Sequence, residues 1–305
     1  MIKLNAETVT NLYLGGANVQ AAWQGVVKVY PATGATGGLP PGRNAYYQSI
    51  LNIGALNGYT LPSPAQQDLQ NNLLQELVNQ GIWDKLDVFY VFANDGSKEF
   101  GNLNWKDPGA YECTTSGSPL WTADQGYTGL PVSTTYVDTG FNVGATSSKF
   151  SSGDASLFAY VYNDIPNNTY GDIGLIEQPP YTGIQWGAIN SRMPAIGALN
   201  SRAEYNLLDT STYPFWTSDV PTSVGFSHVD RSNSTQIKFY KNGTLLNTRS
   251  ATQTAMPSTL TLQFLRGRLA ADYSARTVSI GGVGSSLTTE ANAFYTAINT
   301  YMTSI

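Results

Sequence analysis

Hydrophobic positions in the first part of the chain recur every ten residues. Val9, Val19 and Val29 fall in register, and glycines separate the segments that carry them. This spacing predicts three short strands with turns between them, at residues 8–14, 18–24 and 26–30. A unit of fewer than about 40 residues needs disulfides, metal or association to be stable. The sequence has 1 Cys, so we expect residues 1–31 to associate with copies of themselves or with a larger assembly.

Two helical patterns follow a linker rich in Gly and Pro at residues 32–42. An apolar stripe predicts the first helix over residues 43–56. The second helix has a strong start signal: Ser63 is an N-cap, Pro64 takes the first helical position, and Gln66 completes a capping box. Gly81 ends it. Residues 43–82 are therefore predicted to form a helical pair.

The remainder of the chain has the pattern of a β protein. A compact apolar strand is predicted at residues 87–93, and Gly, Pro, Asn and Ser clusters punctuate the sequence from there on. Further strands are predicted at residues 135–139, 156–162, 171–178, 183–190, 203–208, 223–229, 235–241, 244–250, 259–266 and 275–280. Asn242 and Gly243 favour a tight hairpin turn. Many short strands indicate a sandwich or barrel, and an apolar stripe predicts a final helix over residues 289–302 that packs on it.

Composition narrows the classes of protein. Charged residues make up 12% of the chain, about half of the usual share of roughly 25%, which suits neutral polar surfaces such as those of virion proteins and of sugar-binding proteins. The net charge is −5 with no Lys/Arg block, so we expect no nucleic-acid partner. No apolar stretch is long enough for a membrane span, and the N-terminus lacks the apolar region of a signal peptide.

Several sequence motifs resemble known proteins. The run GFSHVDRS…IKFYKNGTLL at residues 225–246, followed by TVSIGG, is similar to concanavalin A-like jelly rolls of the laminin-G type. Upstream motifs such as GIWDKLD at residues 81–87 and YVDTGF at residues 136–141 resemble tail, collar or spike proteins of bacteriophages. The N-terminal repeats, which end in VYP, look like virion-attachment modules.

The resemblance implies a fold class and a domain order. The expected fold is mainly β, a concanavalin A-like jelly-roll sandwich with a small N-terminal β attachment module, a helical pair and a C-terminal helix. The expected parts are residues 1–31, the linker 32–42, residues 43–82 and residues 83–305.

The resemblance also implies a role in a virion. We expect a spike, fibre, collar or tail component, made in the bacterial host cytoplasm. Its residues 1–31 would contact other virion proteins through Tyr13, Trp23 and Tyr30. The jelly roll would bind host-surface polysaccharide, and the chain would form a homo-oligomer, by analogy a trimer. One alternative is a purely structural head decoration protein without a ligand, and another is an enzyme that degrades polysaccharide.

Catalytic patterns are absent from the sequence. Jelly-roll glucanases carry paired carboxylates on one strand as E-x-D-x-x-E, and no such run exists here. Ser227, His228 and Asp230 are close in sequence, but neighbours on a strand point to opposite faces. The single His and the single Cys, Cys113, make a zinc site improbable. We therefore expect a protein that is not an enzyme.

Two kinds of ligand remain open. Exposed aromatic side chains can stack on sugar rings, although aromatics also fill cores and subunit interfaces. The glycan-binding candidates are Trp186, Tyr181, Tyr213, Phe215 and Trp216, and residues 213–216 place three aromatics in a turn-like context. No cofactor is expected, except that laminin-G-type domains often hold one Ca²⁺ at the sandwich rim. The weak candidates for such a site are Asp138, Asn142 and Asp164.

Overall fold

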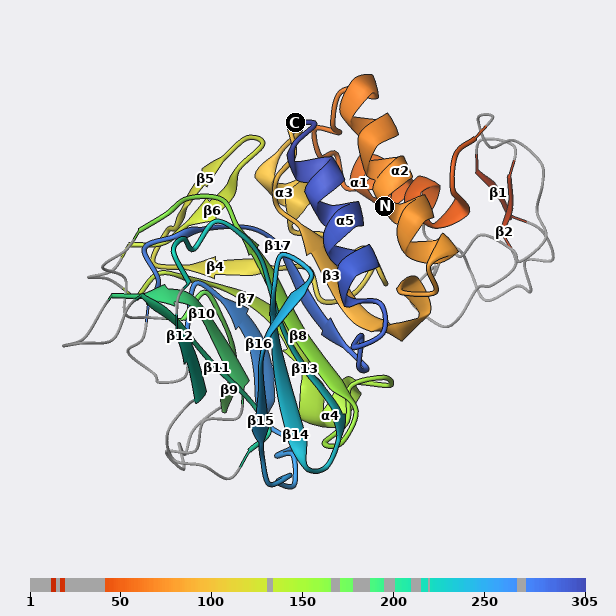
Figure 1. The fold of residues 1–305 in the computed structure, drawn as a ribbon. Coiled ribbons are helices and arrows are strands. Elements are labelled where there is room, and N and C mark those ends of the chain that lie inside the picture. The colour runs from red at the N-terminus through yellow and green to blue at the C-terminus, as the bar shows by residue number, and fades with distance from the viewer. Residues whose placement is uncertain are drawn as a thin grey trace.

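The computed structural model consists mainly of two antiparallel β-sheets (Figure 1). It describes residues 42–130, 134–165, 171–177, 187–194, 201–209, 220–267 and 273–305, and the backbone of the strands at residues 12–14, 17–19 and 215–218. The fold is the mainly β, jelly-roll sandwich class that the sequence predicts. None of the helices in this part of the chain has the length and apolar character needed to span a membrane.

One sheet has seven strands in the order β12-β11-β10-β9-β16-β7-β4. Their bounds are β4 (Thr114–Ser116), β7 (Tyr136–Asn142), β9 (Ile173–Glu177), β10 (Gly187–Met193), β11 (Arg202–Leu207), β12 (Phe215–Ser218) and β16 (Leu260–Phe264). All of its paired strands are antiparallel.

The other sheet has eight strands, seven of them in the order β15-β14-β13-β8-β17-β6-β5, with β3 also paired to β17. Their bounds are β3 (Leu86–Val91), β5 (Leu120–Thr122), β6 (Gly126–Thr128), β8 (Ala155–Val161), β13 (Gly225–Asn233), β14 (Gln236–Lys241), β15 (Thr244–Ser250) and β17 (Thr277–Gly284). The β14–β15 hairpin turns at Asn242 and Gly243, whose φ angles are 49° and 73°. These are the left-handed dihedrals that the Asn-Gly pair predicts.

Apolar side chains fill the space between the two sheets. Alternate positions of each strand face inward, as the period of two in a strand requires. Leu157 on β8 and Phe239 on β14 meet Leu175 on β9 and Leu262 on β16 in one buried cluster. This core fixes which strand ends lie together at each end of the sandwich.

Helices cover the outer face of the eight-stranded sheet (Figure 1). The longer ones are α1 (Ala45–Leu56), α2 (Pro64–Asn79) and α5 (Ala291–Met302). Phe294 of α5 packs on Phe158 of β8 with ring centroids 4.7 Å apart, and Leu74 of α2 belongs to the same buried cluster. The sequence left open whether the helical pair packs on its own sandwich or on a neighbour; the structure places it on its own.

Local sequence signals account for most of these elements. Ser63 caps α2 through the amide of Gln66, with Pro64 at the first position, as predicted. The predicted capping box is not completed: the amide of Ser63 donates to Asp95 over 2.9 Å, and the Gln66 side chain bonds Asp95 and Asp124 instead. Each strand predicted between residues 135 and 280 overlaps an observed one. The sequence missed short elements that tertiary contacts hold: β4, β5, β6, η1 (Trp83–Lys85), α3 (Lys98–Gly101) and α4 (Val143–Thr146).

The N-terminal repeat is described only in part. β1 (Leu12–Leu14) and β2 (Ala17–Val19) pair antiparallel, so a hairpin forms across the first predicted turn. Tyr13 lies on β1, and its side chain is outside the described part of the chain, as are Trp23 and Tyr30.

Candidate functional site

A polar cleft of about 360 Å³ opens at one end of the sandwich. It lies where β11 ends, where β14 begins and where β15 ends, so both sheets contribute to it. Its lining consists of Asp209, Thr235, Gln236, Ser250, Ala251 and Thr252. We call this end of the sandwich the cleft end.

Backbone pairing positions the cleft residues. Gln236 pairs with Ser250 across the β14–β15 hairpin, and the amide of Ala251 donates to the carbonyl of Thr235 over 2.9 Å. From the other sheet, Asp209 accepts the amide of Thr252 on Oδ1 over 2.6 Å. The carboxylate of Asp209 therefore ties the two walls together.

A buried arginine bonds backbone groups next to two residues of the cleft, Asp209 and Thr235. The guanidinium of Arg231 donates to the carbonyl oxygens of Leu207 (3.0 Å), Leu208 (3.1 Å) and Ser234 (3.1 Å). Burial lowers the pKa of Arg231, and the nearby Asp209 carboxylate opposes that shift. Arg231 thus links the end of β11 to the β13–β14 turn, and it offsets the charge of Asp209.

Three of the five predicted glycan-binding aromatics, Tyr181, Trp186 and Tyr213, lie outside the described residues. The strand residues that flank their segments are described. Gly187, which follows residues 178–186, pairs with Leu207, two positions before Asp209 of the cleft. The other segment, residues 210–214, precedes Phe215, which pairs with Tyr205. The described strand residues that flank both segments therefore lie at the cleft end.

Phe215 and Trp216 do not lie in a turn, and the expectation of a turn-like context is wrong. Both belong to β12, where Phe215 pairs with Tyr205 and Trp216 with Glu204. The strand is at the edge of the seven-stranded sheet. β-sheet pairing overrides the local turn signal of the preceding proline because aromatic residues fit a pleated edge well.

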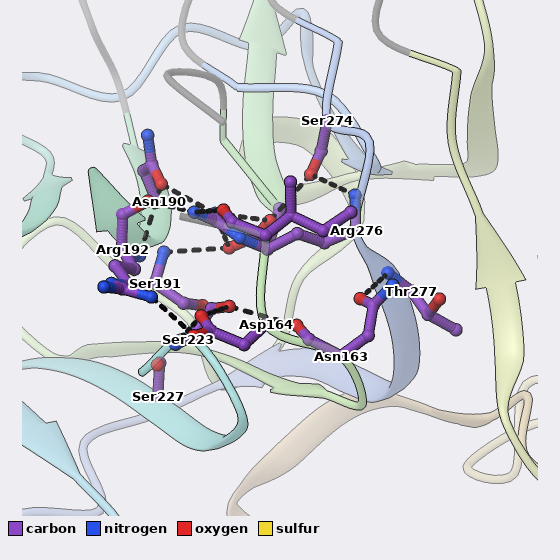
Figure 2. Close-up of polar contacts among 12 residues, drawn as sticks. Asn163, Asp164, Asn190, Ser191, Arg192, Ser223, Ser227, Ser274, Arg276 and Thr277 are labelled. Carbon is purple, nitrogen blue, oxygen red and sulfur yellow. Dashed lines mark hydrogen bonds and ion pairs between the residues drawn. The ribbon is translucent and has the colours of Figure 1, made fainter. Parts of the chain in front are cut away.

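The opposite end of the sandwich is closed by a buried polar network (Figure 2). The Asp172 carboxylate and the Arg276 guanidinium are fully buried and 3.1 Å apart. Asp172 also accepts from the hydroxyl of Ser274 and the amide of Ser191, both over 2.8 Å. Arg276 donates in addition to Oδ1 of Asn190 over 2.8 Å. These bonds stabilise a buried charge pair, although Nδ2 of Asn190 and Oγ of Ser191 have no hydrogen-bond partner in the network.

Asp164, which is labelled in Figure 2, extends this network, and so does Lys241. Asp164 pairs with Arg192 and accepts from the amide of Ser223 over 2.9 Å. The ammonium of Lys241 donates to the carbonyl of Ser223 over 2.8 Å and to the hydroxyl of Ser227 over 3.2 Å. Burial lowers the pKa of Lys241 to about 7. Sequence reasoning did not identify Lys241, although its position on the inward face of β14 was a signal.

The calcium candidates are each held by protein partners. Asp138 accepts from Nε2 of Gln263 over 2.8 Å, and Asn142 caps α4 through the amides of Gly144 and Ala145. Asp164 is engaged by Arg192. Within the described ranges, no three His, Cys, Asp or Glu side chains gather as a metal site would require.

The sole histidine is part of a buried contact on the outer face of β13. Nε2 of His228 lies 3.3 Å from Oδ2 of Asp230, and both side chains are buried. Although burial raises the pKa of Asp230, hydrogen bonds from His228 and the Thr288 and Ser286 hydroxyls lower it below its usual range. Ser227 faces the opposite side and contacts Lys241. The three residues therefore do not form a Ser-His-Asp site.

Comparisons with known proteins give no family. No family model and no curated protein matches the chain. Among solved structures, domain 4 of AbnA, a GH43 extracellular arabinanase from Geobacillus stearothermophilus, in complex with arabinotriose, has a TM-score of 0.37 and 13% identity over 69% of this chain and 98% of that one.

Two further solved structures are similar at the same level. Trypanosoma rangeli sialidase has a TM-score of 0.46 and 8% identity over 77% of this chain and 39% of that one. The binding domain of botulinum neurotoxin serotype D has a TM-score of 0.44 and 14% identity over 71% of this chain and 52% of that one. This chain thus spans well under two thirds of these two chains, and the likenesses establish no ligand or activity for it.

Proposed function

We propose that this β-sandwich protein binds carbohydrate at the cleft end and that it serves as an adhesion component of a bacteriophage virion. The observation that carries the binding role is the cleft of about 360 Å³ with its polar lining. Its volume lies in the range of small-ligand sites, roughly 300–1,000 Å³.

The lining has the chemistry of a sugar-binding site. Thr235, Ser250 and Thr252 offer hydroxyl groups that both donate and accept, and Gln236 offers an amide. Sugar hydroxyls need such paired donors and acceptors. The two segments with predicted aromatics, residues 178–186 and 210–214, join the strands at the same end.

The virion role rests on the sequence. The repeats of residues 1–31 and the motifs of residues 81–141 resemble phage tail, collar and spike proteins. In this proposal residues 1–31 dock to the particle, and the sandwich presents its cleft end to host-surface polysaccharide. A symmetric homo-oligomer, such as a trimer, fits the symmetry of virion positions.

Binding of the full chain to host cells tests the carbohydrate role. We expect saturable binding that extracted surface polysaccharide competes away. Replacing Gln236 and Thr252 together by alanine should weaken binding about tenfold or more, because each lost hydrogen bond costs about 0.5–1.5 kcal/mol. The matched control replaces Gln80 and Thr303, which lie exposed on or beside helices α2 and α5.

Three outcomes would contradict parts of this proposal. Unchanged binding by the Gln236→Ala, Thr252→Ala variant would show that the cleft is not the carbohydrate-binding site. Absence of binding by the folded wild type would favour a purely structural virion protein. Release of reducing sugar from the polysaccharide would indicate the third class, an enzyme that degrades it. Phe215→Ala and Trp216→Ala test the aromatic candidates in the same assay.

The attachment role of the N-terminal repeat has its own test. Deleting residues 1–31 should leave the unfolding transition of the sandwich in place, because the described core contacts come from residues 47–302. Incorporation into virions, measured by immunoblot of purified particles, should be lost. Normal incorporation of the deletion variant would show that these residues are not the attachment module.

A further inference from the structure

A row of side chains leads away from the cleft along the β14–β15 hairpin. Gln236 and Ser250, which line the cleft, form the first cross-strand pair of the row. The next pair on the same face is Lys238 with Thr248, followed by Tyr240 with Leu245. We call these six residues the hairpin strip: Gln236, Lys238, Tyr240, Leu245, Thr248 and Ser250.

The strip lies on the outer face of the eight-stranded sheet, at its edge. β15 is the outermost strand of that sheet, and its residues are exposed apart from half-buried Asn247. Leu245 remains 47% exposed and Leu246 41% exposed. Helix α5 packs on this face where Phe294 meets Phe158 of β8, and it reaches the hairpin only at the Gly243 turn, beside Asn292 and Tyr295. Tyr240 is buried against His228, so the part of the strip that continues the cleft in the open is Gln236, Lys238, Leu245, Thr248 and Ser250.

The charge of this region differs from that of the whole protein. The chain has a net charge of −5, yet residues 231–271 contain no Asp or Glu. The basic residues of this stretch are Arg231, Lys238, Lys241, Arg249, Arg266 and Arg268. Of these, Lys238 lies in the middle of the strip, on the first row beyond the cleft.

Asp230, the acidic residue next to Lys238, already accepts hydrogen bonds from other protein groups. Asp230 lies opposite Lys238 in the β13–β14 ladder. Its carboxylate accepts from the amide of Leu287 over 2.6 Å, from the hydroxyl of Ser286 over 2.7 Å and from the hydroxyl of Thr288. No ion pair joins Lys238 to Asp230 or to any other described carboxylate. The ammonium of Lys238 thus faces outward without an acidic partner in this part of the structure.

We propose that the hairpin strip makes this a site for an acidic polysaccharide, bound along its chain, with a sugar carboxylate on Lys238. This inference rests on the proposed carbohydrate-binding function. One sugar occupies the cleft, and Lys238 lies one row further, about 7 Å along the strand. The adjoining sugar therefore places its carboxylate within reach of the ammonium, as in a charge-assisted hydrogen bond. The exposed Leu245 lies next in the row and offers apolar surface to a following ring.

Carboxyl reduction of the polysaccharide tests this inference. The probe is the host-surface polysaccharide that binds the wild type, compared with the same material after its carboxylates have been reduced to alcohols. We expect the reduced form to bind at least tenfold more weakly. Binding of the native form should weaken as salt rises, because the contact is ionic and exposed. Fragments of three sugars should bind at least tenfold more tightly than single sugars.

Variants of Lys238 locate the contact. Lys238→Met should weaken binding of the native polysaccharide about tenfold and leave binding of the reduced form unchanged, whereas Lys238→Arg should retain the wild-type preference. Lys149→Met removes an exposed lysine on the loop after α4 and serves as the control. Equal binding of native and reduced polysaccharide, with the loss in the Gln236→Ala, Thr252→Ala variant intact, would overturn this inference and leave the carbohydrate role standing. Absence of binding by the wild type to either form would overturn both.

Discussion

Replacing Asp172 by alanine is expected to lower the free energy of unfolding by about 3–5 kcal/mol. The substitution leaves the Arg276 guanidinium buried without its carboxylate, and an uncompensated buried charge costs about that much. Asp172 and Arg276 are both fully buried and 3.1 Å apart. The loss would appear as a lower midpoint in urea unfolding followed by tryptophan fluorescence.

A surface pair provides the control for Asp172. Asp68 lies 3.7 Å from Arg43, and its side chain is 76% exposed, so Asp68→Ala should change stability by less than about 1 kcal/mol. Replacing Asp172 and Arg276 together by leucine and methionine should cost less than Asp172→Ala alone, because no charge is left unpaired. Equal midpoints for Asp172→Ala and wild type would contradict the network of Figure 2.

Stability of the wild type is expected to rise with pH above about 7, because of Lys241. Burial lowers the pKa of Lys241 to about 7 in the folded protein, against an ordinary value of 10.5. Between these values the unfolded chain binds a proton that the folded chain does not. The free energy of unfolding therefore rises by up to about 1.4 kcal/mol per pH unit in this range, and below pH 7 the contribution is flat.

Lys241→Met should remove this part of the pH dependence. Urea midpoints of wild type and variant measured from pH 6 to pH 9.5 should diverge above pH 7, with the smaller slope in the variant. Lys106→Met is a matched control, because burial lowers the pKa of Lys106 to about 8, so the slope it contributes begins about one unit higher. Parallel curves for wild type and Lys241→Met would contradict the lowered pKa of Lys241 in the folded protein.

The two ends of the sandwich thus have different roles. At one end, Asp172, Arg276 and Lys241 are buried and bonded to protein groups. At the other end, the cleft presents hydroxyl and amide groups to solvent. The proposed binding site is at the second end because its donors and acceptors are open to solvent, whereas those of the first end are buried.

Local patterns in the sequence were sufficient for most secondary structure. The alternation of residues in β14, the N-cap Ser63 and the Asn-Gly pair at residues 242–243 each act within a few residues. They can therefore be recognised without knowledge of distant contacts. The fold class followed from them together with the resemblance to jelly rolls. The short strands β4, β5 and β6 have no such signal and depend on pairing with distant strands.

The candidate site could be predicted only in part. The sequence directed attention to aromatic segments, but Asp209, Gln236 and Ser250 gave no pattern of their own. They meet because β11 belongs to one sheet and the β14–β15 hairpin to the other, and the sandwich core brings these ends together. The same holds for Asp172 and Arg276, which lie more than a hundred residues apart.

The sequence by itself determined the type of each long element, the neutral polar character of the chain and a β-sandwich or barrel architecture. These depend on side-chain periodicity and composition, which are local properties. Only the tertiary structure decided which polar groups are satisfied and which face solvent: Lys241 and Lys238 are both lysines of β14, three residues apart. One points into the sandwich and the other away from it, because a strand alternates its faces and the second sheet covers only one of them.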